Sequence, residues 1–448
     1  MVQYSCSRRA ISVLRIHAAG AVVALLLLCA GAPSRAQDVP TYGDLALDFG
    51  EARVVGDVRL RSSLDASRDL SSQPDLDARF PVLARVGAEA AVAESYAARV
   101  LLGAVGELGL RREEPALFVD EAWVEARTGL LGGLARLRFG RQALELQDGR
   151  LVSSEAFVTH PRRVDALRGS ASIGDLELES FLAILSTALA APSPATDTAP
   201  DDLLGGVLAS YQLGSWLRVG GHILGQLGTA VDSIDIPAIT GDERTPLRIL
   251  TLGLEARACP LTWLEAVAAL SLQVGEARAL EQQAVDLHLH TQAAVPGPGQ
   301  PTLRLGYDLA GGDRNPFDLR SNSFRNPLGA RHARFGASDL LAPRNAQDLF
   351  VALRIQEQNS WAELSLHRLQ LDSTREAWLD GEGREILAAP AGDEHLLGYD
   401  LDVAGHLAVH PQLSVELLYA LFLPDGVART AVGNQAAHRL LLGVLARF

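Results

Sequence analysis

The sequence predicts an all-β fold, a transmembrane antiparallel up-and-down β-barrel of about 18 strands. Segments of about ten residues with alternating apolar and polar side chains recur along the chain. The connections between them alternate between short and long, and the chain ends in an amphipathic segment that closes on Phe448. Beyond the N-terminus no apolar run approaches the roughly 20 residues of a transmembrane helix, whereas a barrel strand needs only about 9 to 11 residues.

The N-terminus has the pattern of a secretory signal peptide. Residues 1–36 contain no acidic side chain, and three arginines precede an uncharged apolar run at 18–32. Small residues at positions 34 and 36 predict cleavage after Ala36. We therefore expect a signal peptide at 1–36, a short N-terminal periplasmic segment at 37–52 and the barrel at 53–448.

Two other interpretations of this N-terminus are open. A membrane anchor needs about 20 apolar residues, and the run at 18–32 is shorter. A lipoprotein would be modified at Cys29, but Leu28 stands where a lipoprotein signal has a small residue. Cleavage after residue 36 would leave Cys259 as the only cysteine, so we expect no internal disulfide.

The charge of the chain makes nucleic acid an unexpected partner. The precursor carries 40 basic and 54 acidic residues; without the four arginines of the signal peptide, 36 basic residues remain and the net charge is −18. All the basic residues are arginine. A GC-rich genome explains this most simply, and selection of guanidinium groups to line a pore is the alternative.

Alternation gives each expected strand one apolar and one polar face. At 58–61, Arg59 and Arg61 alternate with Val and Leu, and at 134–139, Arg136 and Arg138 alternate with Leu and Phe. A soluble β-sandwich would show the same period. The strands are expected to start near residues 53, 78, 97, 118, 133, 165, 175, 203, 216, 246, 262, 283, 301, 347, 361, 396, 411 and 437.

The connections favour the membrane barrel. With a periplasmic N-terminus, even-numbered strands end in short turns and odd-numbered strands in long loops, which is the asymmetry of outer-membrane barrels. The long loops are 65–77, 141–164, 186–202, 227–245, 311–346, 372–395 and 423–436. A soluble sandwich has no reason to sort its connections in this way.

The terminal segment 437–448 resembles the last strand of outer-membrane barrels, which their assembly machinery recognises by its final Phe. One observation argues against a barrel: only 5% of the residues are aromatic, although barrels carry aromatic girdles at both interfaces. We expect the Gram-negative outer membrane as the location. The expected partners are outer-membrane lipid and lipopolysaccharide, the barrel-assembly machinery, and an anionic polysaccharide or small anions.

Two stretches resemble the alginate-export (alginate porin) family of outer-membrane barrels. The first is 137–151, followed by 163–168, and the second is 303–316, followed by shorter matches between 322 and 349. They stand in the order that the family shows. The resemblance implies an eighteen-stranded barrel with an arginine-rich constriction that passes an anionic polyuronate.

Arginine suits such a constriction, because its guanidinium stays charged and meets a carboxylate with two hydrogen bonds. Strand alternation supplies four of the expected lumen residues and the family motif supplies four more. Asp148 and Asp165 lie among them and are expected to hold arginines by ion pairing. The expected lumen residues are Arg59, Arg61, Arg136, Arg138, Arg141, Arg150, Arg163 and Arg168.

The structural interpretation of these arginines is that they form Arg–Asp and Arg–Glu ladders that only tie strands together. The leading hypothesis is a channel for an anionic polysaccharide or other anionic solutes. The alternatives are a general porin without polyanion selectivity, a secreted soluble β-scaffold that binds or acts on carbohydrate, and a structural barrel with a plugged lumen. Gating by the loops at 141–164 or 311–346, the exact strand number and the oligomeric state stay open.

No serine elbow, HExxH, P-loop or CxxC pattern is present, so we expect no enzyme and no cofactor. His288 and His290 share a strand face and are a weak metal candidate, because no third ligand stands at a recognisable spacing. The long loop offers a candidate Ca²⁺ site, for which Asx turns are the alternative. Its residues are Asp313, Asn315, Asp318, Asp339 and Asn345.

Overall fold

The structure is a computed structural model that describes residues 44–47, 50–67, 70, 76–92, 95–108, 116–130, 133–154, 161–185, 202–230, 245–277, 280–330, 332, 334–390 and 392–448. The expected signal peptide and its cleavage site lie outside the described residues. In the described part of the chain, no helix has the length and apolar character needed to cross a membrane.

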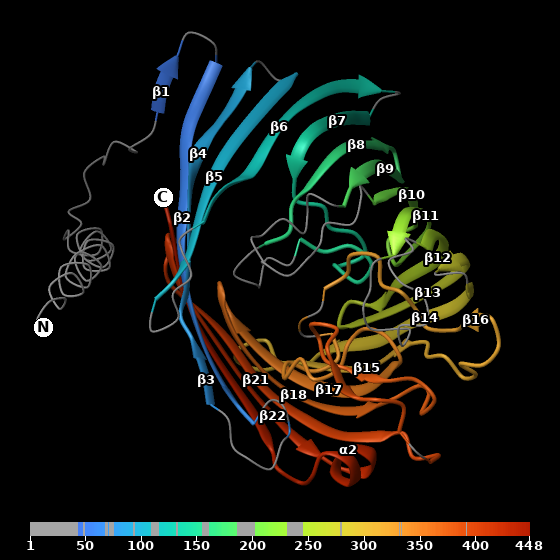
Figure 1. Cartoon of the computed structure of the whole chain (residues 1–448). Coiled ribbons are helices and arrows are strands. Elements are labelled where there is room, and N and C mark those ends of the chain that lie inside the picture. Colours follow the sequence, from blue (N-terminus) through green and yellow to red (C-terminus); the bar gives the residue numbers. More distant parts are fainter. Residues whose placement is uncertain are drawn as a thin grey trace, which may run out of the picture.

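Within the described residues, eighteen antiparallel strands form one closed barrel (Figure 1). Neighbours in the chain pair with each other, and β2 pairs with β23 to close the ring. The predicted fold class is confirmed, and each strand begins within a few residues of its predicted start. The strands are β2 (Gly50–Ala66), β4 (Pro81–Val92), β5 (Tyr96–Glu107), β6 (Ala116–Leu130), β7 (Gly133–Gln142), β8 (Val164–Ile173), β9 (Leu176–Ile184), β10 (Leu203–Leu213), β11 (Leu217–Ala230), β12 (Thr245–Leu261), β13 (Leu264–Ala277), β14 (Leu280–Ala294), β15 (Thr302–Ala310), β17 (Ala346–Glu357), β18 (Ser360–Gln370), β21 (Leu396–His410), β22 (Leu413–Pro424) and β23 (Ala437–Arg447).

Short elements add to this ring. The short strand β1 (Asp44–Leu47) pairs with β2, the first barrel strand. Strand pairing therefore starts inside the segment 37–52, which was expected to precede the barrel. The others are β3 (Leu76–Arg79), which pairs with β2, β16 (Arg320–Ser321), which pairs with β14, the two-stranded β19 (Trp378–Leu379) and β20 (Glu385–Leu387), and the helix α2 (Gly426–Ala431).

The alternating sequence places apolar side chains outside and polar ones inside. On β7, Leu137 and Phe139 are 53% and 65% exposed on the outer face, whereas the alternate residues Arg138 and Gln142 face the lumen with buried or half-buried side chains. The pairing of β7 with β8 runs without a register shift, so the same parity holds along the whole strand. The outer face therefore suits lipid and the inner face suits water.

The connections sort by length as predicted. At one end of the barrel the strands are joined by short turns, for example between Leu213 and Leu217 and between Glu357 and Ser360. At the other end the connections are long, except that Ala277 and Leu280 bound a short one. The short-turn end of an outer-membrane barrel faces the periplasm. By this rule the short turns lie at the periplasmic end of the barrel and the long loops at its extracellular end.

Two extracellular loops fold into the ring of strands instead of away from it (Figure 1). Their described parts are residues 143–154 and 161–163, between β7 and β8, and residues 311–330, 332 and 334–345, between β15 and β17. Val152 pairs with Leu328, which joins the two loops by backbone hydrogen bonds. Their apolar side chains, among them Phe324, Phe335, Leu144, Leu151 and Leu340, form a buried core within the barrel. Trp378, from the connection between β18 and β21, and Phe422 on β22 complete this core.

Candidate transport pathway

The inward loops are fastened to the barrel wall by polar contacts. On β13, Gln273 donates to the carbonyl of Arg325 at 2.7 Å and accepts from its backbone N–H at 2.9 Å. On β14, the fully buried Gln282 donates to the carbonyl of Ser323 at 2.6 Å. These bonds satisfy loop backbone groups that the lumen would otherwise leave unpaired. The inward loops are therefore part of the folded barrel.

Carboxylates on a second part of the barrel wall hold the same loop. Asp402 on β21 accepts a hydrogen bond from the N–H of Ala337, and Asp400 accepts one from the N–H of Ser338, both at 3.0 Å. Arg334 donates to Asp286 on β14 at 2.5 Å. The loop between β15 and β17 thus bridges two walls of the lumen and narrows it.

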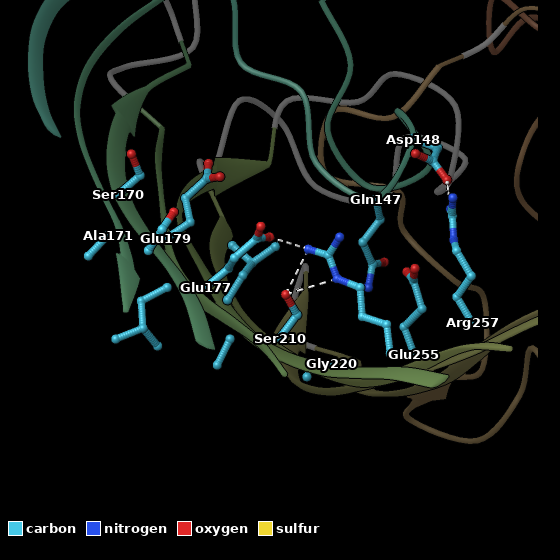
Figure 2. Close-up of a pocket in the computed structure, with 16 residues that line it drawn as sticks. Gln147, Asp148, Ser170, Ala171, Glu177, Glu179, Ser210, Gly220, Glu255 and Arg257 are labelled. Atoms are coloured by element: carbon cyan, nitrogen blue, oxygen red, sulfur yellow. Dashed lines mark hydrogen bonds and ion pairs between the residues drawn. The ribbon is translucent and has the colours of Figure 1, made fainter. Parts of the chain in front are cut away.

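Two cavities lie beside the inward loops, and Asp148 lines both. The first has a volume of about 350 Å³ and lies against β8 to β12. Arg257 donates to Asp148 at 2.8 Å, as Figure 2 shows. Arg218 donates to Glu177 and Ser210. Carboxylates outnumber arginines on this side.

The second cavity, of about 370 Å³, lies against β14 to β22 and is richer in basic groups. Arg304 on β15 donates to Glu363 at 2.6 Å. His288 lies 2.6 Å from Asp308 and 2.8 Å from His290, so these side chains form a hydrogen-bonded chain along the wall. Its basic lining residues are Arg150, His288, His290, Arg304, His332, Arg334 and His367.

Four of the expected arginines lie on inward strand faces. Arg61 on β2 is only 6% exposed and donates to Glu416 on β22 at 3.0 Å, and Arg59 shares its face. On β7, Arg138 lies over the Trp123 ring, with 4.0 Å from the guanidinium carbon to the ring centroid. Arg136 is exposed on the same face and has no hydrogen bond or ion pair within the described part of the chain.

Three more expected arginines lie inside the barrel, each with a carboxylate partner. Arg168 on β8 donates to Glu179 at 2.8 Å. The loop residue Arg150, 7% exposed, donates to Glu255 at 2.8 Å, and its burial lowers the pKa of its guanidinium. Arg163 donates to the fully buried Asp120 at 3.1 Å, as does Arg85 at 2.9 Å.

Arg141 is not in the lumen, contrary to the expectation. The parity of β7 places it with Leu137 and Phe139 on the outer face, near the extracellular rim. There it donates two hydrogen bonds to Asp165, at 2.8 and 2.9 Å. The family motif suggested a lumen position, but the strand continues through residue 141 without a bulge against β8, so the side chain cannot change face.

The carboxylates opposite the arginines were missed from the sequence. Glu125 on β6 accepts from Arg127 at 2.7 Å and from Arg138 at 2.6 Å. Asp148 was expected to support the predicted arginines, but its partner is Arg257. Strand parity places Glu125 in the lumen with Trp123, which is a signal that the sequence contains. The pairing partner itself depends on barrel register.

The two metal candidates gain no support. In the described residues, no group of three or more His, Cys, Asp or Glu side chains is arranged to hold a metal ion. Asp313 and Asp318 accept backbone hydrogen bonds two residues ahead, from Asn315 and Arg320, which is the Asx-turn geometry. Asp339 lies apart from them, with His332 and Arg439.

The model of the alginate export family matches residues 111–441, about three-quarters of the chain. The chain belongs to the alginate export family. No curated protein sequence matches it. The predicted resemblance to this family is confirmed, and with the closed barrel it makes the chain an outer-membrane channel protein.

Solved structures similar to this alginate export family barrel include proteins of Pseudomonas aeruginosa. OccK2 in complex with glucuronate has a TM-score of 0.55 and 14% identity, and the match covers 88% of this chain and 98% of that chain. OpdK with vanillate gives the same values. OccK11 has a TM-score of 0.53 and 10% identity, and the match covers 89% of this chain and 96% of that chain. At these identities the likeness shows the fold alone.

Proposed function

We propose that this channel passes anionic solutes, in the first place carboxylated sugars such as a polyuronate, through its arginine-lined lumen. The observation that carries the proposal is the series of inward arginines on neighbouring strands: Arg59, Arg61, Arg85, Arg99, Arg127, Arg136, Arg138 and Arg168. A carboxylated sugar must shed water to enter the constriction, and fixed guanidinium groups offset that loss.

Two further observations support this class of substrate. The family model is named for alginate export, and a similar channel has been solved with glucuronate. The proposal includes removal of a signal peptide at 1–36, insertion through the barrel-assembly machinery by way of the terminal strand, and contact with lipopolysaccharide. The proposed substrate contacts are the expected lumen arginines other than Arg141, which lies on the outer face.

A general porin is the second candidate, and the ion pairs favour it. Glu125, Glu179, Glu255 and Glu416 each engage a lumen arginine, which reduces the positive charge that an anion would meet. Such a lumen would conduct ions with little preference for sign. The two candidates differ in ion selectivity and in response to a polymer.

Single-channel conductance of the mature chain in a planar bilayer tests the proposal. We expect an anion-selective current that an added polyuronate blocks and that a neutral polysaccharide of the same length leaves unchanged. A current without preference for anions, or one that the polyuronate does not block, would reduce the function to that of a general porin. Failure to conduct at all would support a plugged structural barrel.

A further inference from the structure

The lumen arginines without a carboxylate partner collect at the periplasmic end. Among the described residues, Arg136, Arg354 and Arg447 face the lumen from their strands and have no ion pair. Arg136 lies near the start of β7 at Gly133, Arg354 near the end of β17 at Glu357, and Arg447 is the last residue of β23. Each of these strand ends adjoins the periplasmic side of the barrel. The uncompensated positive charge of the wall is therefore concentrated at the mouth through which an exported molecule would enter.

Arg354 is held in place by an aromatic ring and not by a carboxylate. Its guanidinium carbon lies 4.2 Å from the centroid of Trp361, and His406 stacks near the same indole, at 6.4 Å between centroids and an interplanar angle of 14°. The neighbouring carboxylate, Glu363, is engaged by Arg304 at 2.6 Å. A cation–π contact orients a guanidinium without cancelling its charge.

The hydrogen-bonding capacity of Arg354 is also unused. Its Nε is buried and has no hydrogen-bond partner, and in the described part of the chain no acceptor contacts the rest of its guanidinium. A guanidinium presents a planar fork of donors that fits a carboxylate with two hydrogen bonds. The guanidinium of Arg354 therefore has the charge, the orientation and, on its two amino groups, the free donors to bind a carboxylate.

The two arginines Arg136 and Arg354 lie on opposite walls. In the pairing order of the closed ring, β7 is the fifth of 18 strands and β17 is the fourteenth, so half of the circumference separates them (Figure 1). A chain that carries several carboxylates is thereby attracted toward the axis of the mouth and not to one wall. A single small anion would gain nothing from the second wall.

We propose that Arg354, held against Trp361, is the capture subsite for the carboxylate of a uronate that enters from the periplasm, with Arg136 attracting the same polymer from the opposite wall. This inference rests on the proposed function and gives it a place and a direction. The Trp361 indole beside the guanidinium supplies apolar surface for the C–H groups of a sugar, which an inorganic anion lacks.

The test measures block by a short oligouronate added to one side of a bilayer that holds the full mature channel in a known orientation. The variant is Arg354→Gln. Its matched control is Arg368→Gln, which removes an exposed arginine from the outer face of β18 beside Leu349 and Tyr399. We expect Arg354→Gln to lower the rate of block from the periplasmic side by about tenfold, because fixed charge at a mouth raises association rates by that order or more. Block from the extracellular side should change less than about twofold, and the control should behave as the wild type.

Two more variants separate charge from orientation. Arg354→Lys keeps the charge without the fork and should recover only part of the rate, and Trp361→Leu keeps the arginine but leaves it unoriented, so it should slow block as well. Quenching of the Trp361 emission by glucuronate, measured as the difference between the wild type and Trp361→Phe, reports binding without a current.

The outcomes distinguish this inference from the proposed function. If the uronate blocks the wild type, and blocks Arg354→Gln from either side at the wild-type rate, the capture subsite is wrong while the polyanion channel stands. An equal loss of rate from both sides would place the effect deeper in the lumen and would also overturn the inference. A wild type that no uronate blocks would overturn the proposed function and this inference with it.

Discussion

Arg138 donates two hydrogen bonds to one carboxylate oxygen of Glu125, at 2.6 and 2.9 Å, from the neighbouring strand. The same carboxylate accepts from Arg127 with its other oxygen, at 2.7 Å. Charge-assisted hydrogen bonds are short and strong. Here they hold the guanidinium groups of Arg127 and Arg138 in one geometry. One carboxylate therefore fixes two lumen arginines and cancels about half of their charge.

Glu125→Gln should make the channel more anion-selective. The substitution keeps the shape of the side chain but leaves Arg127 and Arg138 without a compensating charge, so the local potential in the lumen becomes more positive. We expect the anion-to-cation permeability ratio, measured as a reversal potential in a salt gradient, to rise about twofold at low salt and less at high salt.

The control for this charge change is Glu281→Gln, which neutralises an exposed carboxylate on β14 that is paired with Arg320. It lowers the net negative charge of the chain by the same amount away from the lumen arginines. An equal shift in both variants would contradict a local effect of the Arg138 ion pair.

Phe324→Ala should loosen the constriction without unfolding the barrel. Phe324 is fully buried in the core that the inward loops form inside the barrel. Truncating a buried Phe costs about 3 to 5 kcal/mol through lost contacts and the cavity left behind. Here the cost falls on loop docking, because the strand ladder makes its own hydrogen bonds. We expect larger and noisier single-channel currents with a nearly unchanged melting temperature in detergent.

Leu319→Ala is the matched substitution in the same loop, at a side chain that is 79% exposed. It should leave the current unchanged. If Phe324→Ala lowers the melting temperature by as much as the full cost of truncating a buried Phe implies, the barrel and the loops unfold together, and the prediction is wrong.

Much of this architecture was predictable, and the reason is the two-residue period of strands. Val58 and Leu60 had to face lipid, which placed Arg59 and Arg61 inside before any contact was known. The same rule, applied to β7 as far as residue 141, would have excluded Arg141 from the lumen. The family motif indicates a lumen position for Arg141, but a motif does not say which face of a strand a residue occupies.

The ion pairs and the inward loops were not predictable in the same way. Glu416 meets Arg61 because β22, β23 and β2 are adjacent only in the closed ring, which local sequence does not encode. Likewise, Val152 and Leu328 join two loops that are far apart in the chain. Such contacts depend on tertiary register, so an apolar residue in a loop does not reveal whether the loop folds inward.

Cys259 should report the orientation of the barrel. It is an exposed free cysteine near the periplasmic end of β12, and its N–H bonds the carbonyl of Trp216 in the adjacent turn. If cleavage after Ala36 removes the other two cysteines, a maleimide polymer too large for porins should label Cys259 only when the outer membrane is permeabilised. Labelling of intact cells would reverse the orientation, and labelling of Cys259→Ser would show that the signal peptide is retained.

Asp313 should make the extracellular loop sensitive to pH. Burial raises the pKa of this carboxyl above its usual value of 3.8, and the nearby Glu376 carboxylate raises it further, while the backbone N–H of Asn315 opposes the change. Because the pKa of Asp313 is higher in the folded loop, its protonated carboxyl stabilises loop docking. This stabilisation is fully present below the ordinary pKa of Asp and is lost as the pH rises through the pKa of the folded state. Loop docking should therefore weaken from about pH 4 toward neutrality.

Asp313→Asn removes this loss, because the amide stays neutral. The measurement is the rate of tryptic cleavage after Arg314 and Arg320 in the detergent-solubilised barrel, taken as the ratio of wild type to variant so that the pH profile of the protease cancels. We expect the ratio to rise above one as the pH increases. A ratio independent of pH would show that the carboxyl of Asp313 is as well solvated in the folded loop as in the unfolded chain, and the argument from burial would fail.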